Sequence, residues 1–472
     1  MTNLYHQIAT EIISQIETGG YHVGDKLPGV RAASGIYEVS ASTIVAAYDE
    51  LLDGGYIEAR PRSGFYVRAR AQADFLSPKM SQPTMVPRDV VGQQLMLPLL
   101  KQTQNPGTVN LGAAVLDISV LPSSIVEKAL VKAAHLERSN ICLYQFPPGN
   151  LALRQQIAKR MAQLGCELSA DDIVITNGCQ EALLLTLNAV TQRGDAVAVE
   201  SPTYYGILQI IEHLGLKAIE IPTDPQNGIS LDALQLAFEN WPIKACLVIP
   251  NFSNPLGAIM SDENKKALTV LCKKAKVRLI EDDIYGDLSF GAQRPSICKR
   301  FDDKVIYCSS FSKTLAPGLR VGWVASKQLA ETVTQLKFMS NTALPGIVQH
   351  ALADILASGK YDRHLRSLRT KLAKSIHEMI IAIERYFPAN TRITQPKGSF
   401  VLWAELPPEL MKNKDTFTLA LNALEQKIAI TPGKLFSVNQ KYTNCLRLSS
   451  GGMWTPEKEK ALKRLGELIK LL

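Results

Sequence analysis

The stretch Ile306-Tyr-Cys-Ser-Ser-Phe-Ser-Lys-Thr-Leu-Ala-Pro-Gly-Leu-Arg-Val-Gly-Trp323 places a lysine, nearby serines and an arginine around a turn between two apolar runs. Val305 to Cys308 is typical of a short buried strand, and Val321 to Ala325 predicts another after the Pro317-Gly318 break. Lys313 is therefore expected in a loop directly after a strand.

The neighbours of Lys313 decide between two interpretations of this residue. A loop lysine is usually a solvated surface charge. Ser310, Ser312 and Arg320, however, supply two hydroxyl groups and a guanidinium, which hold a phosphate dianion through charge-assisted hydrogen bonds. A lysine beside a phosphate site indicates a Schiff base with a phosphorylated aldehyde, of which pyridoxal 5'-phosphate (PLP) is the common example. The run from Ser310 to Trp323 closely resembles the cofactor-lysine segment of fold type I aminotransferases.

Length and composition set the frame for the rest of the chain. A chain of 472 residues exceeds what one core usually holds, so two or more domains are expected. The eight cysteines include no CxxC pair and lie in apolar runs, which indicates buried thiols of a cytoplasmic protein and predicts neither a disulfide frame nor a metal site. We expect no signal peptide and no membrane association, because no basic start with an apolar core and no membrane-spanning apolar run is found.

The first 70 residues predict three helices and a hairpin. Apolar residues recur every four positions at the start, Gly-Gly pairs close the first and third helices, and a basic turn joins two β-branched and aromatic runs. The predicted elements are a helix from Leu4 to Ile16, a second after Pro28, a third N-capped at Ser40, and strands from Tyr56 to Ala59 and Phe65 to Val67.

Three helices and a hairpin fit a winged helix-turn-helix, in which the third helix enters the major groove, and they fit a small helical cap or dimerisation module equally well. The detailed amino-acid sequence distinguishes these two interpretations. Val23-Gly-Asp-Lys-Leu-Pro-Gly-Val-Arg31 and Gly55-Tyr-Ile-Glu-Ala-Arg-Pro-Arg-Ser-Gly-Phe-Tyr-Val67 resemble the DNA-binding domain of GntR-family regulators. By that resemblance the candidate contacts to double-stranded DNA are Arg31, Ser40, Ser42, Thr43, Arg62 and Gly64.

The charge of this segment is unusual for a DNA-binding domain. Residues 1–70 contain eight carboxylates and six basic side chains, although the whole chain has a net charge of +8. We therefore expect DNA affinity to depend on two such modules bound together.

From Asn110 onward, short β-branched runs alternate with helical patterns. The predicted strands include Ile173 to Thr176 and Ala196 to Val199. This alternation predicts an α/β domain with a mainly parallel sheet, in which ligands bind beyond the carboxyl ends of the strands. The predicted organisation is a DNA-binding domain at 1–70, a linker at 71–108, a large domain at 109–390, and a smaller α+β subdomain at 391–472.

Thr176-Asn-Gly-Cys-Gln-Glu-Ala-Leu183 follows the first predicted strand of the large domain. Asn-Gly is also a common hairpin turn, but the apolar spacing that follows is helical. The backbone N–H groups of Gly178, Cys179 and Gln180 can then face an anion at a helix N-terminus, and in the resembling family this segment is the phosphate loop.

The cluster Ile280-Glu-Asp-Asp-Ile-Tyr-Gly286 is the most informative group of carboxylates. Acidic loops after strands are common, but acids directly beside the apolar run 277–280 are costly unless paired. A carboxylate beside the pyridine nitrogen of PLP keeps that nitrogen protonated, so that the ring can accept electrons. Family spacing assigns this role to Asp282.

The same resemblance implies roles for five further residues, which would otherwise be read as ordinary turn, half-buried or surface residues. These are Tyr204, stacking on the cofactor ring; Asn254 and Tyr285, bonding its phenolic oxygen; Tyr144, reaching the phosphate of a partner subunit; and Arg447, binding a substrate or effector carboxylate. Lys313, Asp282 and Tyr204 would form the catalytic set.

Over essentially its whole length the chain resembles the MocR branch of GntR-family regulators, in which a winged helix-turn-helix is fused to a fold type I aminotransferase-like domain. The resemblance implies a homodimeric, PLP-dependent transcriptional regulator that senses a small amino compound. Two alternatives stay open from sequence: an active aminotransferase acting on an amino acid and a 2-oxo acid, and a regulator whose pocket is only structural.

Overall fold

The computed structural model describes residues 4–17, 20–22, 24–53, 55–60, 63–67, 76–91, 101, 105–138, 142–291, 293–411 and 414–472. The chain divides into two compact units, which are described separately. The smaller comprises Met1–Asp74 and Lys374–Arg385, and the larger comprises Phe75–Ala373 and Tyr386–Leu472. Among the described residues, no helix combines the length and apolar character needed to cross a membrane.

The N-terminal part of the smaller unit has the predicted three helices and hairpin. The Ser40 hydroxyl accepts a hydrogen bond from the Thr43 N–H at 3.2 Å, which makes it the N-cap of the third helix. Tyr48 on that helix is buried and donates its hydroxyl to the Pro28 carbonyl at 2.7 Å, which ties the third helix to the start of the second. The elements are α1 (Leu4–Glu17), α2 (Val30–Ile36), α3 (Ala41–Asp53) and the antiparallel pair β1 (Ile57–Arg60) and β2 (Gly64–Val67).

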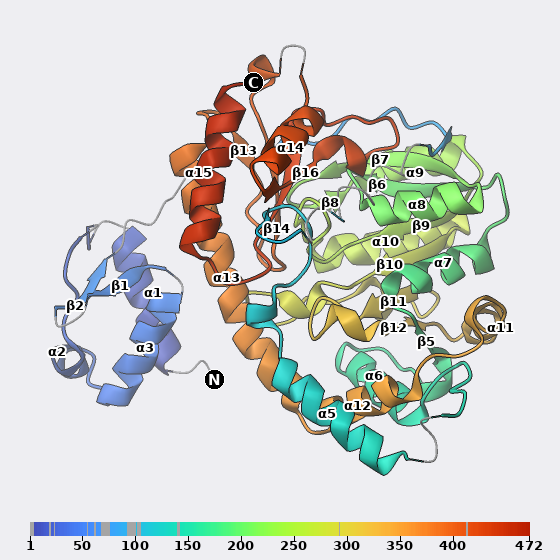
Figure 1. Ribbon diagram of the computed structural model, residues 1–472, viewed down its shortest axis with the longest axis horizontal. Helices are drawn as coiled ribbons and strands as arrows, with labels where there is room; N and C mark the ends of the chain where they lie inside the picture. The colour runs from blue at the N-terminus through green and yellow to red at the C-terminus, as the bar shows by residue number, and fades with distance from the viewer. Residues whose placement is uncertain are drawn as a thin grey trace. The chain divides into compact units, whose positions relative to one another are not determined.

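The larger unit is built on a mixed, mostly parallel sheet covered by helices (Figure 1). Its strand order is β3-β7-β6-β9-β10-β11-β12-β5, and β8 pairs with β7. The pairs from β7 to β11 are parallel, whereas β12 runs antiparallel to both β11 and β5. The bounds are β3 (Arg88–Asp89), β5 (Ile173–Thr176), β6 (Ala196–Ser201), β7 (Lys217–Asp224), β8 (Gly228–Ile229), β9 (Ile243–Val248), β10 (Arg278–Asp282), β11 (Ile306–Ser310) and β12 (Gly322–Ala325).

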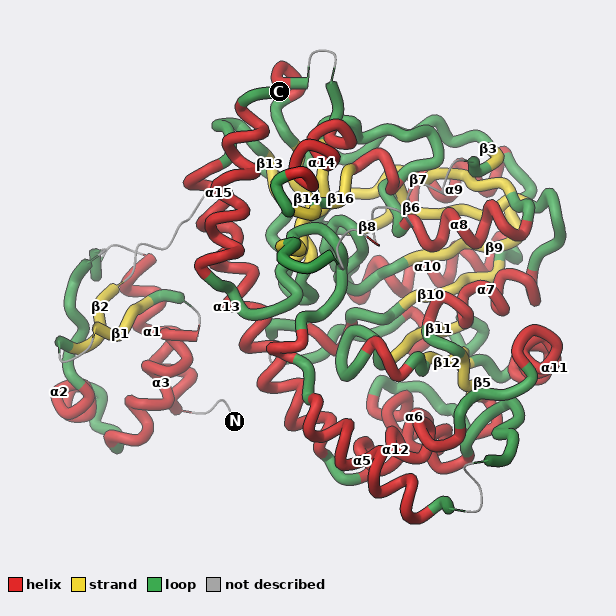
Figure 2. The backbone as a smooth tube through the Cα atoms, in the orientation of Figure 1, coloured by secondary structure: helices red, strands yellow, loops and turns green. Residues whose placement is uncertain are grey.

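Alternating side chains of the central strands pack into two different apolar cores. Val197 and Val199 of β6 pack in the core that includes α7 and α8, whereas Ala198 packs in the core that includes α9 and α10. All six residues of β6 are buried, as expected of a strand with helices on both faces (Figure 2). The helices of this domain are α5 (Ser123–Leu136), α6 (Leu151–Gln163), α7 (Cys179–Val190), α8 (Tyr205–Leu214), α9 (Leu231–Asn240), α10 (Asp262–Ala275), α11 (Ala330–Asn341), α12 (Gly346–Ala357) and the first part of α13 (Lys360–Tyr386), of which Lys374–Arg385 belong to the smaller unit.

The C-terminal part forms a smaller α+β layer. Its antiparallel sheet has the order β13-β14-β17-β16, and a separate parallel pair joins β15 to β4, so that the start of the domain pairs with its end. The elements are β4 (Val109–Asn110), β13 (Arg392–Ile393), β14 (Val401–Glu405), β15 (Ile428–Ala429), β16 (Thr431–Pro432), β17 (Cys445–Ser449), α14 (Thr416–Glu425) and α15 (Pro456–Lys470).

Strand directions decide where the functional residues meet. The parallel strands β6, β9, β10 and β11 all end at the same edge of the sheet, and two successive antiparallel steps bring the end of β5 to that edge too. The loops that follow β5, β10 and β11 carry Gly178, Tyr285 and Lys313 respectively. These three residues therefore lie beyond the carboxyl ends of the strands, where ligands bind in sheets of this kind.

Candidate functional site

Lys313 lies in the turn after β11 and is half-buried. Its Nζ donates a hydrogen bond to the Ala114 carbonyl at 2.6 Å. Burial lowers the pKa of Lys313 to about 8, and the positive charge of Arg447 acts in the same direction. A substantial fraction of the amine is therefore neutral near physiological pH, which is the form that attacks a carbonyl group.

Asp282 is the last residue of β10 and is 1% exposed. The Cys179 thiol, from the first residue of α7, donates to its Oδ1 at 3.4 Å. Burial raises the pKa of Asp282 to about 7, although the thiol and the Lys313 charge oppose that rise. A cationic partner at this carboxylate would relieve the cost of burying its charge.

The turn between β5 and α7 is a candidate anion site, and we call it the anion cup. Gly178 has φ = 81°, and a Cβ there would lie 2.5 Å from Arg320 Nη2, so only glycine lets the arginine close over the turn. Arg320 Nη2 donates to the Asn177 carbonyl at 3.0 Å. The N–H groups of Cys179 and Gln180 have no acceptor within the described part of the chain. Free N–H groups at a helix N-terminus beside an arginine form an anion site.

The two predicted serines lie on the β11 side of this cup, and both are buried. Arg320 Nη1 lies 3.4 Å from the Ser312 hydroxyl, and the Ser312 N–H donates to the Ser310 hydroxyl at 3.4 Å. The Gln180 side chain points elsewhere, because it donates to the Gly206 carbonyl at 2.8 Å. For Gln180, only the backbone N–H is available to an anion in this arrangement.

Arg447 on β17 is fully buried and lies on the other side of the site. Its guanidinium donates to the Gly112 carbonyl at 2.7 Å and to Asn254 Oδ1 at 3.0 Å. It also lies 5.1 Å from the Phe436 ring centroid. These partners are neutral, so the guanidinium has no carboxylate partner within the described residues.

Tyr285 and Tyr204 complete the polar lining. The Tyr285 side chain is fully buried, yet its hydroxyl has no hydrogen-bond partner of good geometry among the described residues. Burial raises the pKa of Tyr285, whereas the nearby Arg447 charge opposes that rise. Tyr204 is the N-cap residue of α8 and packs against Tyr205 with ring centroids 4.7 Å apart. An unpaired buried hydroxyl beside a buried arginine indicates a polar ligand in this space.

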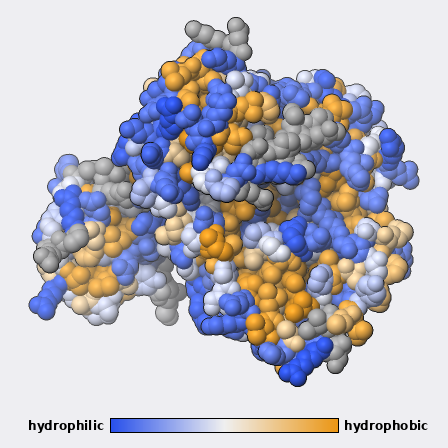
Figure 3. Space-filling model, viewed as in Figure 1, coloured by the Kyte–Doolittle hydropathy of each residue, from blue (hydrophilic) through white to orange (hydrophobic). Residues whose placement is uncertain are grey.

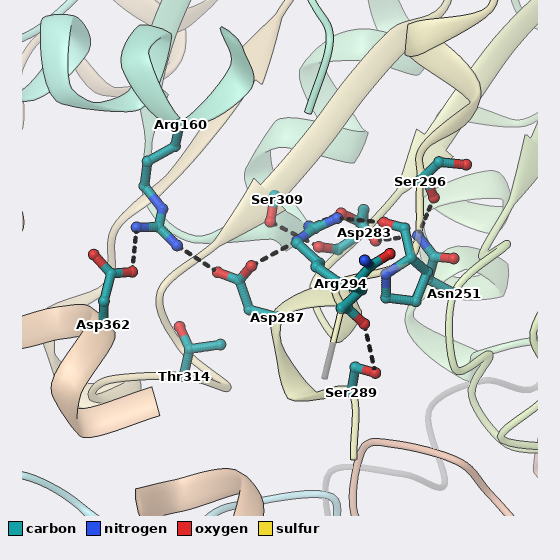
Figure 4. Close-up of polar contacts among 12 residues, drawn as sticks. Arg160, Asn251, Asp283, Asp287, Ser289, Arg294, Ser296, Ser309, Thr314 and Asp362 are labelled. Atoms are coloured by element: carbon teal, nitrogen blue, oxygen red, sulfur yellow. Dashed lines mark hydrogen bonds and ion pairs between the residues drawn. The ribbon is translucent and has the colours of Figure 1, made fainter. Parts of the chain in front are cut away.

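A buried polar network that sequence reasoning missed begins at Asp283, the residue after Asp282 (Figure 4). The Asp283 carboxylate accepts from the Tyr307 hydroxyl at 2.8 Å and from Asn251 Nδ2 at 3.0 Å, and it is bonded to Arg294 Nη2. Arg294 Nε also donates to Asp287 at 2.6 Å, and the Asp287 pKa is lowered by this guanidinium and by that of Arg160, against the effect of burial. The network fixes the backbone that carries Asp282.

Tyr144 lies apart from the site residues of the same chain. It is 72% exposed, and its ring stacks on Phe146 with centroids 5.5 Å apart. Phe146 in turn lies 6.0 Å from Phe338 of α11. On α5, Val131 and Leu136 are also more than half exposed, and Figure 3 shows apolar surface in the region of that helix.

The predicted DNA contacts lie on two surfaces of the helix-turn-helix. Arg31 on α2 is exposed, and the Ser40 hydroxyl bonds those of Ser42 and Thr43 at 2.8 and 2.7 Å at the start of α3. Gly64 begins the second strand of the wing with φ = 112°. Arg62 lies outside the described residues.

One basic residue near the wing was missed. The Lys26 side chain reaches the position of Gly64 and lies over the Tyr66 ring, 5.9 Å from its centroid. Arg60 lies over the same ring at 4.2 Å. Lys26 belongs to the Val23–Arg31 segment, and nothing in that segment indicated that its side chain would lie beside the wing. The contact between Lys26 and the wing is formed only by the folded chain.

Comparison with known proteins gives two family matches. The family described as "Aminotransferase class I and II" matches residues 108–465, and that described as "Bacterial regulatory proteins, gntR family" matches residues 4–67. The uncharacterised HTH-type transcriptional regulators YdcR and YjiR of Escherichia coli are 39% and 37% identical to the chain. Each alignment covers 98% of both proteins.

Solved structures of aminotransferases are similar to the larger unit of this chain. The multiple substrate aminotransferase of Thermococcus profundus is 26% identical with a TM-score of 0.73, and the match covers 81% of this chain and 96% of that one. The α-aminoadipate aminotransferase LysN of Thermus thermophilus is 26% identical with a TM-score of 0.74, covering 80% and 95%. The chain therefore belongs to the GntR-family HTH-type regulators that carry a class I and II aminotransferase domain, an architecture of the MocR type.

Proposed function

We propose that the chain is a PLP-dependent transcriptional regulator that binds DNA through residues 1–70 and senses an amino compound at Lys313. The observation that carries this proposal is a half-buried lysine with a lowered pKa, placed between an anion cup and a buried carboxylate, on a chain that also has a GntR-type domain. The neighbouring structure LysN is described as complexed with N-(5'-phosphopyridoxyl)-L-leucine, which supports a pyridoxyl group in this fold.

The residues present fit PLP in chemistry. Lys313 would hold the aldehyde carbon, and Asp282 would pair with the pyridine nitrogen, whose positive charge relieves the cost of a buried carboxylate. The orphaned Tyr285 hydroxyl, together with Asn254, would bond the phenolic oxygen. The phosphate would bind the N–H groups of α7 with Arg320.

When bound, PLP supplies an aldehyde that condenses with primary amines and a ring that accepts electrons. The side chains of this protein then select the amine. Arg447 has no carboxylate partner among the described residues and is surrounded by neutral acceptors, so it would take an α-carboxylate through two parallel hydrogen bonds. Its position 193 residues beyond Asn254 in sequence, yet 3.0 Å away in space, brings the smaller subdomain against the larger one at the site.

In a regulator of this kind, effector binding must cause a conformational change that alters binding to DNA. Binding of an effector at the interface of the two subdomains would favour one closure of the domain over another, and a ligand shifts such an equilibrium only through its differential affinity. We propose a homodimer, with Tyr144 of each chain completing the phosphate site of the other, because this tyrosine is exposed and apart from the site of its own chain. The cytoplasm is the compartment in which such a DNA-binding protein would act.

The experiment that tests cofactor binding uses the full chain loaded with PLP. Borohydride reduction followed by peptide mapping should place the pyridoxyl group on Lys313, and Lys313→Ala should lose both the modification and the cofactor absorbance. Modification spread over surface lysines, with equal absorbance in the variant, would refute the proposed site.

A second function, full transamination, is favoured by one specific observation. Within the described residues, Lys313 and Asp282 of the set expected for catalysis form hydrogen bonds to neutral groups, the Ala114 carbonyl and the Cys179 thiol, and no ion pair joins them to another side chain. This supports their availability, with Tyr204, to a cofactor and substrate. Steady conversion of an amino acid and a 2-oxo acid by the wild-type chain, absent in Lys313→Ala and without specific DNA binding, would establish the enzyme as the primary role.

A further inference from the structure

Lys337 is a buried cation on α11 that none of the roles above uses. Its side chain is 1% exposed, and its Nζ lies 2.9 and 3.0 Å from the two carboxylate oxygens of Glu181 on α7. With the Asn341 amide oriented to satisfy its neighbours, the oxygen of that amide accepts from Lys337 Nζ at 3.2 Å. A lysine buried this deeply is held by its partners, so the pair has a fixed geometry.

Glu181 connects this pair to the anion cup. Its Oε2 accepts the Asn177 N–H at 2.5 Å, and the Asn177 carbonyl accepts from Arg320 Nη2 at 3.0 Å. The Asn177 backbone therefore lies between Glu181, which accepts from its N–H, and the guanidinium of the cup, which donates to its carbonyl. Gly178, whose positive φ forms the turn, follows directly.

Electrostatics explain why a lysine is needed here. Glu181 is in the first turn of α7, where its charge is stabilised by the helix N-terminus, but the same N-terminus faces the proposed phosphate. A carboxylate with a side chain only 16% exposed would repel a phosphate dianion at short range. Lys337 cancels that charge and keeps the carboxylate on the Asn177 N–H.

We propose that Lys337 is a positioning residue of the phosphate cup, acting through Glu181 and Asn177, and that it gives the site its preference for a phosphorylated over an unphosphorylated pyridoxal. The inference rests on the proposed function, since it presumes PLP at this cup. It adds that the affinity for the phosphate depends in part on a residue of α11 that does not itself touch the ligand.

The test compares PLP with pyridoxal, which has the aldehyde and ring but no phosphate. Dissociation constants of both are measured by absorbance on the full chain for wild type, Lys337→Met, Lys337→Gln and Lys337→Arg. Lys327→Met, which removes an exposed lysine shortly before the same helix, is the matched control. The glutamine variant keeps a hydrogen-bonding group but removes the charge. If the methionine variant does not fold, the glutamine variant is used for the comparison.

We expect the neutral variants to bind PLP about tenfold more weakly, as is typical when a supporting partner of a ligand-binding group is lost, and to bind pyridoxal as wild type does. Lys337→Arg should recover most of the preference, and Lys327→Met should retain all of it. Unchanged preference in both neutral variants, or equal weakening of PLP and pyridoxal, would overturn the inference. A wild-type chain that binds no PLP would instead overturn the proposed function itself.

Discussion

Replacing Arg294 with methionine is expected to destabilise the larger unit by about 3 kcal/mol, because it removes the only guanidinium that Asp283 contacts in the described residues. The Asp283 side chain is fully buried, and the Arg294 side chain is 15% exposed. Methionine keeps much of the volume and the apolar stem, so the change isolates the loss of charge and of hydrogen bonds.

The magnitude follows from what remains after the substitution. Asp283 keeps its bonds from Tyr307 and Asn251 but loses its counter-ion, and Asp287 keeps Arg160 at 3.4 Å. Breaking one buried pair typically costs about 3 to 5 kcal/mol, and the remaining partners place Arg294→Met at the lower end of that range. With a urea m-value of about 3 kcal/mol/M, the midpoint would fall by about 1 M.

Urea unfolding followed by tryptophan fluorescence measures this change selectively. All four tryptophans, Trp241, Trp323, Trp403 and Trp454, lie in the larger unit, so the signal reports on that unit alone. Arg300→Met is the control, because Arg300 is exposed and close in sequence, and its loss should change stability by less than about 0.5 kcal/mol. An Arg294→Met midpoint equal to that of Arg300→Met would refute the argument.

Three further predictions concern the site, its cup and the DNA-binding domain. Because burial lowers the pKa of Lys313 to about 8 from the ordinary 10.5, the rate of PLP capture should rise with pH with a midpoint near pH 8. A stopped-flow midpoint near 10.5 would contradict this expectation. Gly178→Ala should weaken PLP binding at least tenfold by displacing Arg320, and it should also lower the unfolding midpoint, because alanine is strained at φ = 81°. An absorbance titration that gives the wild-type affinity would contradict this expectation. Ser40→Ala removes the acceptor of the Thr43 N–H and should lower the local stability of α3 by about 1 kcal/mol. This stability is measured by hydrogen exchange of the full chain, and unchanged exchange rates in α3 would show that the N-cap is dispensable.

Much of the fold followed from local pattern, because each strand of the parallel sheet is a buried β-branched run. Ile173 to Thr176 was predicted with the bounds that β5 has, whereas β6 continues two residues beyond the predicted Val199. The extension includes Glu200 and Ser201, which are polar but remain in register with β7. The edge strand β3 gave no signal, because Arg88 and Asp89 are exposed and join the sheet only through pairing with β7.

The residues of the site also divide into those that a local sequence pattern indicates and those that it does not. Lys313 and Gly178 lie in loops directly after strands, and Asp282 is the last residue of a strand. At all three, chain position and residue type together indicate chemistry. At Arg294 and Lys337 they do not, because their partners are brought to them only by the fold: Lys337 meets Glu181 across 156 positions of sequence. Such long-range ion pairs have no local pattern, and a helical lysine is read from sequence as a surface charge.

The most direct test of the central claim is DNA binding by wild type and Lys313→Ala on the upstream region of the chain's own gene, at stated salt, with PLP and a panel of amino compounds. A PLP-dependent sensor predicts specific binding by both proteins, and a change in affinity or DNA geometry on adding an amino compound in the wild type alone. Specific binding that responds equally in the two proteins, or that no amino compound alters, would contradict sensing through Lys313.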